Sequence, residues 1–403
     1  MNNVEVQEYI ARIGSEITTP LWKEPRSFPE GMPLRIDSIL KWNHSFDRYL
    51  LKHPNEVNDF QLASILSMFR CVNGEFGGMI YTCPECGKTK DIQFGCHSRS
   101  CSRCGKRYAE SWGRKLMERF LPKNHRHIIF TLPGPLWELV LSRPEVFLND
   151  MFKAVKAVIK RIFKHRFKKM RVRFGLISLI HYSGRDLKPN PHIHSIASEG
   201  GLTKQGKWFD HFYWPYKKMN EYWKYEVLKR FRSHHCLSLE EKSIIDNQFK
   251  KRFEDGTNGF VVKNYRDILD VKNFGSYLAR YVRHPPIGES RLLGFDGINV
   301  GIKYEWDNKV FETNVTIENF IRAILINISP KGFQEVRYYG LYANLFYDRA
   351  KKVLMGITIR ATTLYEFEEE ARNRNIICSG CKVVMEVMLI TYLKNGRMVR
   401  IIF

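Results

Sequence analysis

The sequence is poor in acidic residues and lacks long apolar runs. It holds 42 Asp and Glu against 65 Lys and Arg, which leaves a formal net charge of +23. No uninterrupted hydrophobic stretch is long enough to span a bilayer. The opening MNNVEVQEYI lacks the basic-then-apolar order of a signal peptide. We therefore expect a cytoplasmic protein with no membrane partner, and the excess of positive charge indicates nucleic acid as the first candidate partner.

The chain also lacks a Walker-type glycine-rich loop, an internal repeat and a low-complexity tract. The missing loop argues against nucleotide hydrolysis. What is present is the composition of a globular protein. Hydrophobic residues make up 44% of the 403 residues, which is enough for a buried core and for more than one domain.

Hydrophobic periodicity and turn residues predict a mixture of helices and strands. Helices are expected over much of 1–70, over 109–121 and 146–170, over much of 204–265, over 271–284 and over 317–329. Strands are expected over 125–133, 174–182 and 191–198, and within 291–306. The stretch SGRDLKPNP, full of turn residues, joins the strands 174–182 and 191–198.

Cysteine usage favours metal binding over disulfides. Of nine cysteines, five lie between Cys83 and Cys104, which in a cytoplasmic protein is typical of a metal site. Two CxxC knuckles, Cys83–Cys86 and Cys101–Cys104, are separated by residues 87–100, close to the spacing of a zinc ribbon. They predict one closed structural zinc site made of four thiolates.

Other potential ligands surround this predicted site. Cys96 could displace one of the four thiolates, and Cys71 and His97 are further candidates. Cys378 and Cys381 form a separate CxxC pair near the C-terminal end. Two thiols do not close a zinc site, so this pair stays unassigned.

The residues around the knuckles are basic, as a DNA-binding ribbon requires. Lysine and arginine neutralise phosphates and supply affinity that does not depend on base sequence. The DNA contacts predicted here are Arg99, Arg103, Lys106 and Arg107.

Three histidines form a candidate metal centre. His192 and His194 are two residues apart on a predicted strand, so they share one face while Ile193 anchors the other. Such a pair is often incidental, but His181 ends the preceding strand and would lie beside His192 if the two strands pair. A capping or core histidine is the alternative for His181. Imidazole suits Mn, Zn or Ni better than Mg, yet phosphate oxygens and water would complete the shell, so Mg or Mn is expected.

Tyr277 and Tyr281 form a candidate nucleophile pair. They are four residues apart on a predicted helix, so both phenols share one face and could reach one scissile phosphate in turn. Two core aromatics on an amphipathic helix are the alternative. A phenol titrates near pH 10, so it needs a metal to stabilise the developing charge. Arg280 and Arg283 make the helix basic and are expected to hold the DNA strand.

Several stretches together resemble one family, the two-tyrosine HUH transposases of rolling-circle insertion sequences, of the IS91 type. Six blocks occur in the family's order, which is far more specific than any one of them. They are 71–87 and 94–112 for the N-terminal zinc-binding domain, 127–136 for the first core strand, 179–202 for the metal motif, 277–287 for the tyrosine motif and 320–344 for the closing segment.

The resemblance implies roles for individual residues. His192 and His194 match the HUH histidines, His181 the third ligand, and Tyr277 and Tyr281 the paired nucleophiles. Two departures fall outside these residues. The family usually has His-Pro before the first motif histidine, where this chain has Asn-Pro, and SIASEGGL after the motif is more polar than usual.

The resemblance also implies a fold class and a division of the chain. The fold is α+β, with an HUH endonuclease core in which helices flank an antiparallel sheet, after a helical and zinc-ribbon-like N-terminal region. The expected parts are an N-terminal helical region 1–70, a zinc-binding DNA-binding domain 71–120, an HUH catalytic domain 121–345 and a C-terminal tail 346–403.

The combined hypothesis is a transposase that nicks and joins single-stranded DNA, or hairpin element ends, through a 5′-phosphotyrosine. It would use histidine-bound Mg or Mn and structural Zn, in a prokaryotic cytoplasm at the nucleoid. An HUH replication initiator or relaxase shares this chemistry and is one alternative. A non-catalytic zinc-ribbon DNA-binding protein is the other. The sequence does not reveal an oligomeric state.

Overall fold

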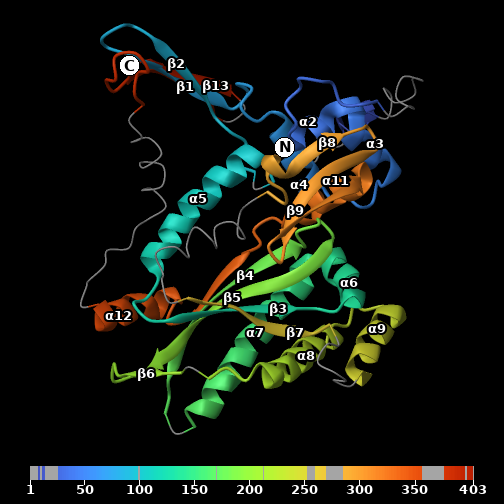
Figure 1. Ribbon diagram of the computed structural model, residues 1–403, viewed down its shortest axis with the longest axis vertical. Coiled ribbons are helices and arrows are strands. Elements are labelled where there is room, and N and C mark those ends of the chain that lie inside the picture. The colour runs from blue at the N-terminus through green and yellow to red at the C-terminus, as the bar shows by residue number, and fades with distance from the viewer. Residues whose placement is uncertain are drawn as a thin grey trace.

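The computed structural model describes residues 8–9, 11–13, 26–98, 100–168, 170–211, 213–251, 259–268, 285–355, 376–394 and 397–402. Within these ranges the chain forms three antiparallel sheets with helices packed against them (Figure 1). The mixed α and β content expected from the sequence is therefore present, with antiparallel sheets throughout the described part.

The largest sheet has the strand order β11-β4-β5-β3-β7, and β6 pairs with the far end of β5. Its strands are β3 His125–Thr131, β4 Arg173–Ser183, β5 Pro189–Leu202, β6 Trp208–Asp210, β7 Val261–Ile268 and β11 Val336–Gly340. Strands β4 and β5 form a long hairpin across the SGRDLKPNP turn, as predicted. The three predicted strands are confirmed, and β5 extends beyond its predicted end.

The two faces of this sheet are covered by different helices, because alternate residues of a strand point to opposite faces. On one face, Phe130 and Ile193 are buried in a core with the helices that follow β3 and β6. These helices are α6 Trp137–Ser142, α7 Pro144–Arg166, α8 Tyr216–Arg232 and α9 Leu239–Lys250. On the other face, Leu179 and Ile196 pack with Leu116 and Tyr342.

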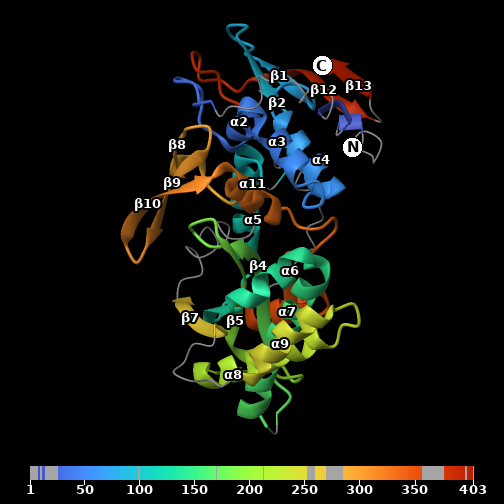
Figure 2. The same cartoon turned by 90° about the vertical axis from the view of Figure 1, so that its right-hand side faces the viewer.

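A second body combines the N-terminal helices with a later part of the chain (Figure 2). Its elements are α2 Ile36–Lys41, α3 Ser45–Lys52, α4 Asp59–Phe69, β8 Leu292–Phe295, β9 Asn299–Trp306, β10 Lys309–Thr316 and α11 Ile317–Ile326. Lys52 Nζ lies 2.6 Å from Glu318 Oε1, and Gln61 Nε2 donates to the Leu325 carbonyl at 3.0 Å. The predicted N-terminal helices are thus confirmed from Ile36 onward, but they share their core with 292–326.

The third sheet joins the two ends of the chain. Its order is β13-β12-β1-β2, with β1 Gly77–Thr82, β2 Thr89–Gln93, β12 Glu386–Lys394 and β13 Arg397–Ile402. Gly77, with φ +84°, pairs with Tyr392 so closely that a Cβ there would lie 2.1 Å from the Thr391 carbonyl oxygen. The segment 346–403 is therefore not a separate tail, because its last strands complete a sheet begun by residues 77–82.

Helix α5, Ser102–Arg119, runs from this small sheet toward the large one (Figure 1). It begins seven residues before the predicted helix 109–121, because Gly105 and Ala109 already lie on its buried face. The second CxxC knuckle therefore leads directly into a helix. Helix α12, Asn344–Met355, packs against the large sheet through Ala350.

One expectation from the sequence is corrected, and another concerns residues outside the described part of the chain. The stretch 204–265 contains α8 and α9 but begins and ends with strands, β6 and β7, whose aromatic and charged residues hid their periodicity. The predicted helix 271–284 lies outside the described residues. Across the helices that the structure describes, none combines the length and apolar character needed to cross a membrane.

Candidate metal centre and cysteine clusters

The hairpin β4–β5 brings three imidazoles together. His181 on β4 is directly opposite His192 on β5, and His194 follows on the same face of β5. Ile193 points the other way and is fully buried in the core beneath α7 and α8. The side-by-side placement predicted from strand pairing is therefore observed, and it rests on the register that the short turn sets.

The ring nitrogens of these histidines converge on one point. His192 Nε2 lies 3.0 Å from His194 Nε2 and 3.3 Å from His181 Nδ1. Nitrogens that bind one cation at about 2.1 Å stand roughly 3 Å apart when they meet near a right angle. The donor set therefore fits one metal ion. No carboxylate belongs to the group among the described residues.

Two further contacts decide which nitrogen of each ring faces the centre. His192 Nδ1 donates to the Asn190 carbonyl at 2.5 Å, which leaves the lone pair of Nε2 for a ligand. His194 Nδ1 lies 2.8 Å from His127 Nε2 on β3. We assign the shared proton to His194 Nδ1, since His194 Nε2 faces the other two rings. Such outer partners fix tautomer and orientation in metal sites.

Burial keeps the rings of His192, His194 and His127 uncharged. Desolvation lowers the pKa of His192 to about 4 and that of His194 well below its ordinary value, with the neighbouring imidazoles adding to the second shift. Desolvation likewise lowers the pKa of His127 to about 3. Neutral imidazole is the form that binds a metal, so the cluster is ready for a cation at physiological pH.

Several predicted site residues lie outside the described part of the chain. The candidate nucleophiles and the basic residues beside them belong to the segment 269–284, and one predicted DNA contact precedes the second CxxC knuckle. They are Tyr277, Tyr281, Arg280, Arg283 and Arg99.

A first cysteine cluster sits where the β1–β2 hairpin meets α5. It consists of Cys71, Cys96, Cys101 and Cys104. The Sγ atom of Cys71 lies 3.6 Å from those of both Cys101 and Cys104, and Cys96 Sγ lies 3.9 Å from Cys104 Sγ. Four sulfurs at about 2.3 Å from one zinc ion stand roughly 3.8 Å apart in a tetrahedron. This cluster has that spacing.

The predicted grouping of the two knuckles is wrong. Cys83 and Cys86 do not join Cys101 and Cys104 but gather with Cys378 and Cys381. The cause is the hairpin between the knuckles. The first knuckle lies at its tip, whereas the second lies at its base, and a strand of five residues spans about 17 Å. Cys96 and Cys71, which the sequence left as alternatives, supply the missing ligands at the base.

The basic residues on α5 divide into two kinds. Arg103 is half-buried, and its Nη1 donates to the Cys71 carbonyl at 3.3 Å, so its guanidinium supports the cysteine cluster. Lys106 and Arg107 are exposed on the first turns of the same helix. These two side chains are available to a polyanion.

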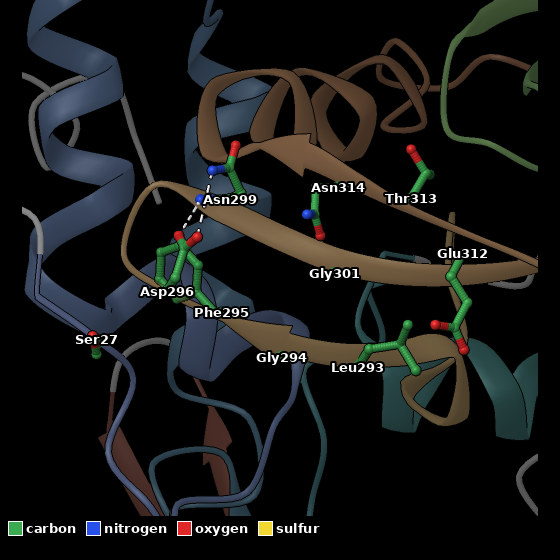
Figure 3. A pocket seen from close by; sticks show the side chains of 10 residues that line it. All are labelled: Ser27, Leu293, Gly294, Phe295, Asp296, Asn299, Gly301, Glu312, Thr313 and Asn314. Carbon is green, nitrogen blue, oxygen red and sulfur yellow. Dashed lines mark hydrogen bonds between the residues drawn. The ribbon is translucent and has the colours of Figure 1, made fainter.

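A pocket at the β8–β9–β10 sheet shares no residue with the histidine cluster (Figure 3). It has a volume of about 610 Å³, and Asp296 on its wall accepts hydrogen bonds from the backbone of Ile298 and Asn299. That carboxylate caps its own turn, and histidine and cysteine are both missing from the pocket lining. The histidine cluster is therefore the better candidate for chemistry.

Sequence reasoning missed two features of these sites. His127 lies on a predicted buried strand but is not among the predicted metal ligands, although its alternation with Ile128 puts it on the same face as His125. The C-terminal CxxC pair has no predicted partner. The repeated CxxC spacing was the available signal, but it does not tell which knuckles meet.

Comparison with known proteins finds similarity to transposases. Residues 42–132 match the family model described as "Transposase zinc-binding domain", and residues 175–350 match the one described as "Putative transposase". The chain is 22% identical over 329 residues to "Putative transposase y4qJ" of Sinorhizobium fredii, a match covering 75% of this chain and 80% of that protein.

A second relative is the transposase for insertion sequence element IS801 of Pseudomonas savastanoi pv. phaseolicola. It is 23% identical over 299 residues, which cover 72% of each chain. No solved structure matches the chain. Each of the two family matches spans the residues of one cluster described above. The first contains Cys71, Cys96, Cys101 and Cys104, and the second contains the three clustered histidines.

Proposed function

Because this chain is a transposase of the IS91 family with an N-terminal zinc-binding domain, we propose that it cuts and rejoins single-stranded DNA through a 5′-phosphotyrosine intermediate. The substrate would be the single-stranded or hairpin ends of its own mobile element. The observation that supports this proposal is the convergence of three imidazoles on one face of the large sheet.

We propose that the large sheet and its flanking helices are an HUH catalytic core within 121–345. Two histidines on the central strand β5, and a third beside them on β4, support this assignment. The cluster at the base of α5 supports a structural zinc in the zinc-binding region 71–120.

His181, His192 and His194 would hold the catalytic cation. A bound Mg²⁺ or Mn²⁺ would polarise a phosphoryl oxygen and stabilise its developing charge. The protein's own contribution is preorganisation, because the three ligands come from one hairpin. Asn190 and His127 orient two of the rings before any substrate arrives.

Tyr277 and Tyr281 are the proposed nucleophiles. A phenol oxygen would form a bond to the phosphorus of the scissile phosphate, while the bond from phosphorus to the 3′ oxygen breaks and the phenolic proton ends on that oxygen. The product is a 5′-phosphotyrosine and a free 3′-OH. One phosphate ester replaces another, so a 3′-OH can later reverse the attack and rejoin DNA without a nucleotide. The second tyrosine would serve this later step.

The DNA strand would be held by basic residues from two segments of the chain. Lys106 and Arg107 are exposed on α5, and Arg280 and Arg283 flank Tyr281 in the sequence. The net charge of +23 supports a polyanionic substrate, since each neutralised phosphate releases condensed counterions.

The test is the covalent adduct. The full chain is incubated with labelled single-stranded oligonucleotides from the element ends plus Mn²⁺ or Mg²⁺, and denaturing gels are read for a protein–DNA band. We expect an adduct from the unaltered protein, loss of the adduct with a chelator, and loss in the Tyr277→Phe/Tyr281→Phe double variant. His192→Ala should also abolish the adduct while leaving DNA binding in place.

Tyr213→Phe is the matched control, because Tyr213 is 74% exposed and belongs to neither cluster. It should form the adduct normally. A non-catalytic DNA-binding protein would bind the oligonucleotides and form no adduct at all. An adduct that persists in the double phenylalanine variant would remove both tyrosines from the mechanism.

A further inference from the structure

A second group of four cysteines lies at the tip of the β1–β2 hairpin. Cys83 and Cys86 follow β1, and Cys378 and Cys381 precede β12. We propose that these four thiolates bind a second structural zinc ion, which clamps the C-terminal hairpin β12–β13 to β1–β2. The proposal is independent of the DNA chemistry above.

The spacing of the sulfurs suits a metal and not a disulfide. All four sulfurs lie within 4.8 Å of one another, and the Sγ atoms of Cys86 and Cys378 are 3.7 Å apart. Tetrahedral thiolates around zinc stand roughly 3.8 Å apart, whereas bonded sulfurs lie about 2.05 Å apart. The same spacing, 3.6–3.9 Å, occurs in the cluster at the base of α5.

The two knuckles of this group have the same backbone turn. In the first, Cys83 N donates to the Lys88 carbonyl, and Gly87 N donates back to the Cys83 carbonyl, both at 2.9 Å. In the second, Cys378 N donates to the Val383 carbonyl at 2.9 Å, and Lys382 N donates to the Cys378 carbonyl at 3.1 Å. Segments almost 300 residues apart thus form two equivalent halves of one site.

The position after the second cysteine of each knuckle is left-handed. Gly87 has φ +67° and Lys382 has φ +62°. Glycine adopts this conformation without strain, but a lysine does so only at a cost, so the surrounding structure must hold it there. A metal bound by Cys378 and Cys381 would supply that restraint.

The small sheet has a small core. Among the described residues, this core contains four buried residues, Tyr81, Cys83, Cys378 and Met385, with five partly buried hydrophobic residues packed against them. A core of this size rarely holds a fold without a metal or disulfide. A link between Cys86 and Cys378 would span 292 positions of sequence, and restraint of so long a loop removes much of the unfolded chain's entropy.

The charge around the site also agrees with a bound tetrathiolate. Four thiolates and one Zn²⁺ carry a net charge of −2. Lys88 Nζ reaches the second knuckle, where it would lie 3.5 Å from a Cβ placed on Gly380, and Lys382 is exposed beside it. Two lysines therefore lie next to the excess negative charge.

The first experiment counts zinc in the purified full chain and in paired variants, by elemental analysis and native mass spectrometry. Cys378→Ser/Cys381→Ser should lose one zinc per chain, and so should Cys83→Ser/Cys86→Ser. Combining all four substitutions should still cost only one zinc. Cys236→Ser is the matched control, since Cys236 is exposed and belongs to neither cluster, and it should lose none.

The single-ribbon grouping makes the opposite prediction. If Cys83 and Cys86 bound zinc together with Cys101 and Cys104, replacing Cys378 and Cys381 would leave the zinc content unchanged. That result would overturn the proposal, and it says nothing about adduct formation, so the two proposals fail separately.

A second measurement uses the unaltered chain, so it can be made even if the cysteine variants fail to fold. The native chain is treated with a thiol-alkylating reagent, and modification is read at each cysteine by mass spectrometry. Cys86 and Cys381 are exposed, yet bound zinc should protect them until a chelator is added. Cys236 should react in both conditions. Rapid alkylation of Cys381 with zinc present would exclude it as a ligand.

Discussion

Two hydrogen bonds outside the proposed ligand set decide which ring nitrogens of His192 and His194 face the metal centre. The Asn190 carbonyl accepts from His192, and His127 pairs with His194 from the neighbouring strand. Burial removes the charged form of both rings, so each ring is one of two neutral tautomers. The hydrogen-bond partner decides which of the two tautomers is present. Residues outside the proposed ligand set would therefore control the affinity for the proposed cation.

Replacing His127 with phenylalanine tests this control at the residue scale. The ring volume is kept, but the partner of His194 Nδ1 is removed, so His194 can adopt the wrong tautomer. We expect Mn²⁺ affinity to fall by about 10–100-fold, the usual cost of losing such a partner. Titration calorimetry measures this, and the Mn²⁺ dependence of adduct formation should shift in parallel.

The exposed His235 offers a control, because His235→Phe should leave Mn²⁺ affinity unchanged. Unaltered affinity in His127→Phe, with the fold intact, would mean that His127 only fills space.

At the scale of elements, strand β3 concentrates buried imidazoles on one face. His125 and His127 alternate with Ile128 and Phe130, which face the opposite core. His125 is fully buried beside Phe120, and its Nε2 lies 2.5 Å from the Tyr342 hydroxyl. Strand β3 therefore links the face that carries the histidine cluster to the packing of α5 and the segment after β11.

This burial predicts acid sensitivity. Desolvation lowers the pKa of His125 to about 4, below the unfolded value of about 6.5, so the unfolded chain takes up the proton first. The group's contribution to stability is complete above about pH 6.5 and is lost as the pH falls toward 4. Between pH 7 and pH 4, we expect the unfolding free energy of His125→Gln to fall by less than that of the unaltered chain. The difference between the two losses should be at most about 3 kcal/mol.

Urea unfolding at several pH values, with a chelator present throughout, provides the measurement. His235→Gln should keep the slope of the unaltered chain. If His125→Gln and the unaltered chain lost stability in parallel, His125 would not be the neutral buried group described here.

At the scale of the whole molecule, the dominant property is charge. A net charge of +23 over 403 residues makes DNA affinity depend strongly on salt. The exposed Lys106 and Arg107 follow Cys104 on α5, which packs on one face of the large sheet, whereas α9 belongs to the core on the other face.

We expect the logarithm of the single-strand binding constant to fall linearly with the logarithm of salt concentration. Lys106→Gln/Arg107→Gln should reduce the steepness of that line by about 1.4, which is about 0.7 for each phosphate that is no longer neutralised. Fluorescence anisotropy from 50 to 300 mM salt, roughly the range where such slopes are measured, gives the value. Lys242→Gln on α9 is the control, and an equal change there would indicate only the effect of net charge.

Local pattern was enough to place the proposed metal ligands. Residues two apart on a strand share a face, and a short turn between two strands makes them pair, so His181, His192 and His194 could be brought together without coordinates. The helix α7 and the strand β3 followed from periodicity in the same way. Interactions over a few residues govern each of these features.

What only the tertiary structure decided are the partners of residues far apart in the chain. Which cysteines share a cluster depends on the β1–β2 hairpin, which holds Cys83 away from Cys101, and on β12, which brings Cys378 back to β1. His127 joined the site through pairing of β3 with β5. Sequence spacing determines which side chains can share a face, but long-range packing chooses among chemically identical thiols and imidazoles, because spacing alone gives them no preference.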